Sequence, residues 1–356
     1  MTPWMRFLLR RLAAIPITLL IITAALYAVF MLSPPEDRAQ LYLPPNIPRV
    51  VTPEVMQRII DGTIERHGLD DPYPQQYARW ASRLLRGEWG WSPVLRADVL
   101  ELLLLRAPVT IELTIFSLLL LIPLGLAAGV VAGWREGGRI DGGTRLAAFI
   151  ATSLPPFILG LFLLSIFYVG LRWFPPGRTG IVELSLQTVT TFQAYTGFLV
   201  LDGILNRRPD VVLDALRHLV LPVFTLSLVH WATLARITRA AIIDVKDQDY
   251  VTSANARGLM RRSVIWRHTF RNALGPSLTS SALSAASLIT GAFVVEVIFN
   301  LKGLSDLVIR SVQHAPDAPL AMGFAVFSVL LVMPIMFLLD VVRAWVDPRL
   351  RLEVEE

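Results

Sequence analysis

Long blocks nearly free of charged side chains constrain this chain more than any other feature of its sequence. Each block holds about 20 mainly apolar residues, the length of helix that spans the hydrocarbon core of a bilayer. Backbone polar groups in that core must be bonded within the chain, so a helix is the expected structure. The sequence therefore predicts an all-α, polytopic membrane protein with six transmembrane helices. The blocks are Leu12–Leu32, Val109–Gly133, Leu146–Leu171, Leu219–Ile237, Pro276–Phe299 and Leu320–Val342.

Composition supports a membrane class and removes several others. Of 356 residues, 54% are hydrophobic and only 17% are charged, whereas soluble domains carry about a quarter charged residues. The net charge of +5 comes almost entirely from Arg at the ends of apolar blocks, which favours anionic lipid headgroups over nucleic acid. The absence of cysteine excludes disulfides, cysteine-ligated metals and a thiol nucleophile.

The first block predicts a retained membrane helix. Arg6, Arg10 and Arg11 precede it like the charged start of a signal peptide. The apolar run is longer than the roughly 7–15 residues of a signal peptide, however, so a membrane helix is the better interpretation. We therefore expect residues 1–32 to form a cytoplasmic N-terminus and the first span, and residues 108–356 to hold the other five.

Basic residues are distributed unevenly between the two sets of connecting segments. The N-terminus, 134–145, 236–272 and the tail carry 17 of the 33 Lys and Arg in about half the length of the opposite set. The positive-inside rule then places both termini in the cytoplasm of a bacterial or archaeal cell. Residues 33–107, 172–217 and 300–319 are predicted to be external, with an amphipathic helix around Pro53–His67.

The cytoplasmic loop 236–275 is too long for a simple connection. Helix-forming residues from Asp249 lead to Gly258, a plausible helix end, and a second basic helical stretch stops at Gly275 and Pro276. Two short helices with a glycine break at the membrane surface suit either protein docking or binding along anionic lipid. Charge alone favours the lipid interpretation.

The loop resembles the EAA coupling loop of bacterial ABC importer permeases, in the form found in the dipeptide and oligopeptide family. The matching letters are DYVTSANARGL at 249–259 and RNALGP at 271–276. Other elements similar to that family follow in order along nearly the whole chain. They are FLLRRL at 7–12, GLD at 68–70, GEWGWS at 87–92, PVTIEL at 108–113, SLPPF at 153–157, HLVLP at 218–222, EVIF at 296–299 and DPRLR at 347–351.

The resemblance implies the type I ABC importer permease fold and a set of partners. A second permease chain, two ATP-binding subunits carrying ATP and Mg, and an external solute-binding protein would complete the complex. This chain has no phosphate-binding glycine loop with its Lys, so ATP hydrolysis would belong to the partner subunits. The residues that would dock on the ATPase are Asp249, Tyr250, Ala254, Ala256, Arg257, Gly258, Leu259 and Arg261.

The fifth apolar block is small and weakly polar. Such helices either pack closely against neighbours or line a polar path. We predict a translocation path that includes Ser284, Ser287, Thr290 and Glu296, with Glu296 facing a peptide amino group. Pairing with Arg at the membrane surface is the alternative for such acids, for example Arg106 with Glu112.

Other functions remain as alternatives. Within the importer class, peptides are the expected cargo, and nickel complexes, glutathione or oligosaccharides stay open. An ion-coupled secondary transporter needs intramembrane acids near the midplane and repeated halves, which the sequence does not show. The sequence also contains no catalytic or metal-binding motif. His230 and Trp231, inside the fourth block, are interpreted as packed side chains.

Overall fold

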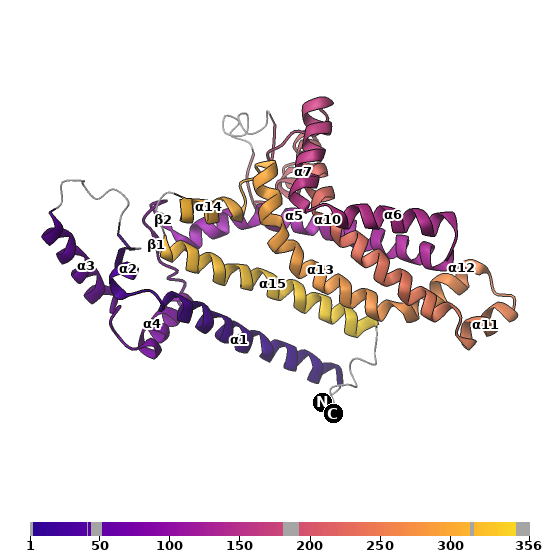
Figure 1. Cartoon of the computed structure of the whole chain (residues 1–356), viewed down its shortest axis with the longest axis horizontal. Helices are drawn as coiled ribbons and strands as arrows, with labels where there is room; N and C mark the ends of the chain where they lie inside the picture. The colour runs from indigo at the N-terminus through magenta and orange to yellow at the C-terminus, as the bar shows by residue number, and fades with distance from the viewer. Residues whose placement is uncertain (1–2, 41, 44–51, 181–191, 314–316, 347–356) are drawn as a thin grey trace. The chain divides into compact units, whose positions relative to one another are not determined.

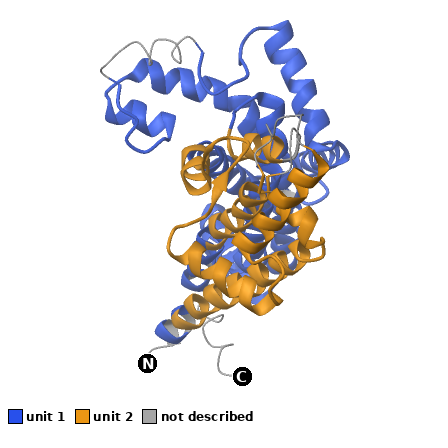
Figure 2. Ribbon diagram, turned by 90° about the vertical axis from the view of Figure 1, so that its left-hand side faces the viewer, with its two compact units in different colours: residues 1–8, 108–302, 334–356 blue, residues 9–107, 303–333 orange. Residues whose placement is uncertain are grey.

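The computed structural model describes residues 3–40, 42–43, 52–180, 192–313 and 317–346. The chain divides into two compact units (Figure 2). Unit 1 comprises Met1–Leu8, Pro108–Lys302 and Pro334–Glu356, and unit 2 comprises Leu9–Ala107 and Gly303–Met333. The predicted element DPRLR at 347–351 lies outside the described residues.

Within the described ranges, five helices are long and apolar enough to cross a membrane (Figure 1). They confirm five predicted blocks and extend beyond most of their ends. A sixth span is possible by length and composition if two helices joined by a bend count as one. The five are α1 (Pro3–Phe30), α5 (Val99–Trp134), α10 (Pro209–Lys246), α13 (Phe270–Phe299) and α15 (Ala318–Val346).

The third predicted block is not a single straight helix. It consists of α6 (Arg139–Ser153) and α7 (Pro156–Leu164), which continues as η1 (Ser165–Gly170), with a bend of 99° between them. Leu154 and Pro155 are extended, with ψ of 127° and 141°. Each of them precedes a proline, and a residue before proline is pushed out of the helical region. The double proline therefore breaks the helix where the sequence predicted one continuous span.

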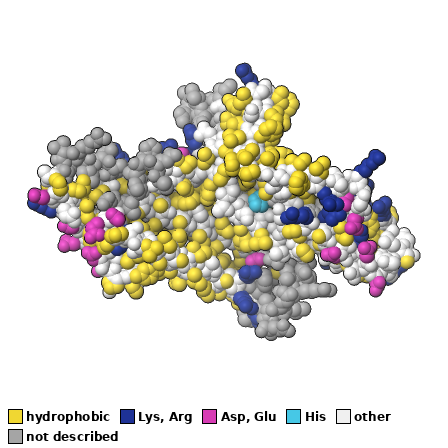
Figure 3. All heavy atoms as spheres, viewed as in Figure 1, with side chains coloured by type: hydrophobic (Ala, Val, Ile, Leu, Met, Phe, Trp, Pro, Cys, Tyr) yellow, Lys and Arg dark blue, Asp and Glu magenta, His cyan; other side chains and the backbone are white. Residues whose placement is uncertain are grey.

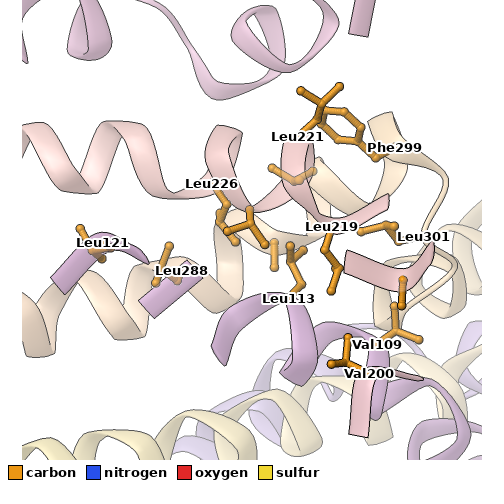
Figure 4. Packing of buried hydrophobic residues seen from close by; sticks show 14 of the residues in the cluster. Val109, Leu113, Leu121, Val200, Leu219, Leu221, Leu226, Leu288, Phe299 and Leu301 are labelled. Atoms are coloured by element: carbon orange, nitrogen blue, oxygen red, sulfur yellow. The ribbon is translucent and has the colours of Figure 1, made fainter. Parts of the chain in front are cut away.

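The core of unit 1 lies between α5, α7, α10, α13 and the short helix α9 (Leu199–Leu205). Leu113 and Leu288 are fully buried, and Phe299 is almost so. Figure 4 shows side chains of this cluster that come from several helices, among them Leu113 of α5, Leu219 of α10 and Leu288 of α13. Burying such a side chain contributes about 1.5–3 kcal/mol, so this cluster fixes the helices that carry the polar membrane residues.

Three glycines in α5 form a close seam with α10. Gly125, Gly129 and Gly133 follow one another at four-residue spacing, which places them on one helix face. A Cβ added at Gly129 would lie 2.5 Å from Thr238 Cβ and 2.7 Å from the Ala235 carbonyl oxygen. Only glycine allows the two backbones to approach this closely.

Unit 2 contains the short elements between α1 and α5. They are α2 (Pro35–Gln40), α3 (Pro53–His67), α4 (Tyr73–Leu85) and a hairpin of β1 (Trp91–Ser92) with β2 (Ala97–Asp98), while α14 (Leu304–Gln313) belongs to its second segment. The amphipathic helix predicted at Pro53–His67 is confirmed with the same ends. It buries Ile60 and Ile64 and stops at Gly68, whose φ of 58° is left-handed.

Candidate functional site

The predicted docking element lies between α10 and α13 and is helical with a sharp turn. It consists of α11 (Asp249–Ala256), α12 (Arg261–Ser263) and η2 (Val264–Thr269). Gly258 joins the first two with φ of 74°, a left-handed conformation that side chains disfavour. No heavy atom lies within 4 Å of a Cβ built there, so the turn is open.

One side of this element packs against its own unit. Val251 and Val264 are fully buried and Ala254 is nearly so, and they form a cluster with Trp134 at the end of α5 and Val245 near the end of α10. Burial of the 251 and 254 positions fixes the orientation of α11 against the ends of α5 and α10. Any change in the position of α11 is therefore passed to those two ends.

The other side is uncovered. Of the eight residues predicted to dock, only Ala254 is buried, and the other seven are exposed. Two of the seven have large apolar side chains, Tyr250 at 43% and Leu259 at 42% accessible, and the neighbouring Met260 is 79% accessible. Exposed apolar groups beside arginines are typical of an interaction surface. The docking role of these residues stays a prediction.

Ion pairs connect the ends of the helices around the element. Arg239 on α10 donates from Nε and Nη2 to the two carboxylate oxygens of Asp141 on α6, at 2.5 and 2.8 Å. Lys246 at the end of α10 pairs with Glu136 just after α5. On the visible face, Lys and Arg gather toward the α11 end of unit 1 (Figure 3).

The four predicted path residues lie on two faces of α13. Ser284 and Glu296 are buried, whereas Ser287 and Thr290 are exposed. Ser287 and Thr290 belong to an exposed stripe with Leu283, Val294 and Val297. The structure therefore does not bring the four together, and their common role in a path stays a prediction.

Glu296 is 1% accessible and lies within α13. The Thr110 hydroxyl donates a hydrogen bond to its Oε1. A carboxylate in the membrane interior is costly unless it is hydrogen-bonded or paired. Its burial at the junction of α5 and α13 makes it part of the structure of unit 1 as well as a path candidate.

Glu112 is held by a segment far away in the sequence. Arg178 Nη2 lies 3.0 Å from its Oε2, and the backbone N–H groups of Leu199 and Val200 donate to it at 3.2 and 2.8 Å. The alternative pairing with Arg106 is wrong, because Arg106 lies 3.6 Å from Asp306 instead. Sequence spacing pointed to a neighbour on the same helix, and nothing in the sequence indicates a partner 66 residues away.

The glycine seam is a feature that the sequence interpretation missed. Its signal was present, since three glycines at four-residue spacing in an apolar block indicate close helix packing. Among the described residues, no group of three His, Asp or Glu side chains could hold a metal ion.

The long apolar helices define a polytopic membrane protein, and an exposed helical turn lies between α10 and α13. The chain belongs to the family of binding-protein-dependent transport system inner membrane components, whose model matches residues 122–352. A second model, for the N-terminal part of such membrane components, matches residues 4–114. The family predicted from the coupling loop and the other elements is confirmed.

Two peptide transport permeases are similar in sequence to most of this chain. The oligopeptide transport system permease protein AppB of Bacillus subtilis is 33% identical over 342 residues, 96% of this chain and 97% of that protein. The di/tripeptide transport system permease protein DppB of Pseudomonas aeruginosa is 34% identical over 288 residues, 81% of this chain and 84% of that protein. The MetNI methionine ABC transporter, in an inward-facing crystal form, gives a TM-score of 0.49 at 16% identity, covering 69% of this chain and 96% of that one.

Proposed function

We propose that this chain is the permease subunit of an ATP-driven importer of di- or oligopeptides. It forms the translocation path with a second permease and takes its energy from two separate ATP-binding subunits. An external solute-binding protein delivers the cargo. The peptide transport named for the relatives supports the cargo class, and the exposed turn at Gly258 supports the coupling role.

The open turn carries the proposal. In this mechanism the exposed side of α11 and the 257–261 turn contact an ATP-binding subunit. The buried side, through Val251 and Val264, moves with the ends of α5 and α10. A rigid-body movement of the ATPase then becomes a tilt of two helices that the glycine seam holds together.

The topology is part of the proposal. The 236–275 loop and both termini face the cytoplasm of a bacterial or archaeal cell, and 33–107 faces outward, as the distribution of Lys and Arg indicates. Nickel complexes, glutathione and oligosaccharides are the other cargo classes to test. The choice among them rests with the binding protein as well as with this chain.

The test is ATPase activity of the purified complex in lipid with its binding protein, over a panel of peptides, nickel and oligosaccharides. Gly258→Asn places a side chain on the docking surface, and Asn tolerates a left-handed backbone better than most residues. Gly137→Asn is the matched control, because Gly137 has the same φ of 74° and equally open surroundings.

We expect peptides to stimulate the wild type and the Gly137→Asn variant, and Gly258→Asn to lose most of that stimulation while the complex still assembles. Normal coupling in Gly258→Asn would remove the turn from the mechanism. Stimulation by nickel or oligosaccharides and not by peptides would replace the cargo class.

A further inference from the structure

Unit 2 contains a cavity of about 280 Å³ with tyrosines and tryptophans among its lining residues, named here the aromatic pocket. Small-molecule sites usually measure roughly 300–1,000 Å³ and are lined by apolar and aromatic groups with a few polar ones. The aromatic pocket therefore suits a ligand of about one or two amino-acid residues. Its aromatic lining residues are Tyr27, Tyr42, Trp80, Trp89 and Trp91.

Positive charge at the rim comes from α4. Arg79 and Arg83 both line the aromatic pocket. Arg79 is paired with Asp71 at 2.5 Å, whereas Arg83 is exposed and forms no ion pair or side-chain hydrogen bond with any residue that the structure describes. Glu88 is the lining carboxylate, also exposed. The guanidinium of Arg83 is thus available to an anion.

A third arginine lies behind the wall of the aromatic pocket. Arg38 is 3% accessible, and it donates from Nη2 to the Leu69 carbonyl at 2.8 Å and from Nη1 to Gln76 Oε1 at 3.1 Å. Leu69 and Gln76 both line the aromatic pocket. Its Nε is buried without a hydrogen-bond partner, and within the described ranges no carboxylate pairs with it.

Arg38 makes the wall formed by Leu69 and Gln76 electropositive. A buried guanidinium without a carboxylate keeps its field, because no counter-charge cancels it and the surroundings are of low dielectric. Tyr42 adds a neutral hydroxyl, since burial raises its pKa to about 12 against the opposing fields of Arg38 and Arg83. The Tyr42 hydroxyl and an exposed guanidinium in one cavity with aromatic walls favour a carboxylate attached to an apolar body.

We propose that the aromatic pocket binds the C-terminal residue of a short peptide, with its carboxylate on Arg83 and its apolar side chain against the tryptophans. Glu88 opposes a second acidic group, so peptides with one carboxylate are preferred. The proposal rests on the peptide import proposed above and adds a recognition site to it. It assigns a binding role to a segment outside the docking element and outside α13.

The experiment measures peptide binding to the purified complex in lipid nanodiscs by calorimetry, without ATP and without the binding protein. The probes are the dipeptide alanyl-phenylalanine and the same dipeptide with its C-terminus amidated. We expect the free acid to bind at least about tenfold more tightly, because a carboxylate accepts charge-assisted hydrogen bonds from Arg83 and a neutral amide does not.

Arg83→Gln should reduce binding of the acid to the level of the amide. Arg86→Gln is the matched control, since Arg86 follows the same helix, is exposed and does not line the aromatic pocket. It should bind the acid like the wild type. Trp91 is 59% accessible. Trp91→Ala should weaken the binding of alanyl-phenylalanine more than the binding of alanyl-alanine.

Equal binding of acid and amide, or unchanged binding in Arg83→Gln, would overturn the proposal. The binding assay does not depend on ATP hydrolysis, so a negative result contradicts the peptide site without contradicting the proposed function. The two proposals can also give opposite results. If the acid binds and binding requires Arg83, while no peptide stimulates the ATPase, the peptide site in the aromatic pocket is supported and peptide import is contradicted.

Discussion

Glycine has opposite uses in two regions of unit 1. At Gly129 the neighbouring helix leaves no room, and an added Cβ would lie 2.5 Å from Thr238 Cβ. At Gly258 the backbone has a left-handed φ of 74°, and nothing lies within 4 Å of an added Cβ. The first glycine allows two span helices to touch, and the second allows a chain reversal on an uncovered surface.

The difference fits the proposed transmission of movement from an ATP-binding subunit to the spans. Two helices in close contact move together, because packed interfaces have few intermediate arrangements. An open turn at the end of these helices can receive a partner without repacking. A substitution in the seam should therefore act on folding, and a substitution in the turn should act on coupling.

The largest expected effect is that of Gly129→Ala. The added methyl group must push α5 away from Thr238 and the Ala235 carbonyl, and overpacking of this kind costs about 1–3 kcal/mol. Gly143→Ala is the matched control in α6, where nothing lies within 4 Å of the new atom. It should stabilise by about 0.5–1 kcal/mol. Thermal unfolding in detergent measures both, and equal shifts would contradict a close seam.

Asp141→Asn should have the next largest effect. The change removes the charge from a buried carboxylate that accepts two bonds from Arg239, at 2.5 and 2.8 Å. Loss of such a pair costs about 2 kcal/mol. Asp210→Asn removes a carboxylate from an exposed pair with Arg208 and should leave unfolding unchanged. A similar melting temperature for Asp141→Asn and the wild type would show that the pair does not hold α6 to α10.

Met260→Asp should separate coupling from folding. Met260 is 79% accessible, so the new charge costs no burial in the free chain. Docking against a partner would desolvate it, and we expect peptide-stimulated ATPase to fall about tenfold with an unchanged melting temperature. Lower stability together with normal stimulation would place Met260 in the fold of this chain instead of at its interface.

Much of the fold could be predicted, because span length and basic loops depend on local composition. The ends of α3 also have a local cause, because Pro53 starts the helix and the left-handed Gly68 follows its last residue. The 99° bend was not predicted, because it depends on the combined effect of two consecutive prolines on the residues before them. Serines on α13 could not be assigned to a buried or an exposed face, since small polar residues occur on all sides of that helix.

Partners distant in sequence were the least predictable part of the candidate site. Glu112 is held by Arg178 and by backbone N–H groups at Leu199 and Val200, none of which lies on the same helix. The turn at Gly258 was easier, because a glycine after a run of helix-forming residues is a local signal, whereas the docking role of its neighbours comes from the family resemblance and stays a prediction. The aromatic pocket escaped the sequence interpretation because its lining residues come from several segments of unit 2.

The smallest expected effect concerns His67, whose side chain is neither as buried as the seam nor as exposed as the turn. Its ring stacks on Tyr42 with centroids 4.6 Å apart. Burial lowers its pKa below the ordinary value of 6.5, and Arg83 and Arg66 lower it further. The unfolded chain therefore binds a proton more readily, so the contribution of the neutral ring to stability is present above pH 6.5 and decreases as the pH falls through that value. Hydrogen exchange of residues 53–69, corrected for its intrinsic rate, should be faster at about pH 5 than at about pH 8. His67→Phe keeps a ring against Tyr42 without a titrating group, and persistence of the pH effect in that variant would assign it to another residue.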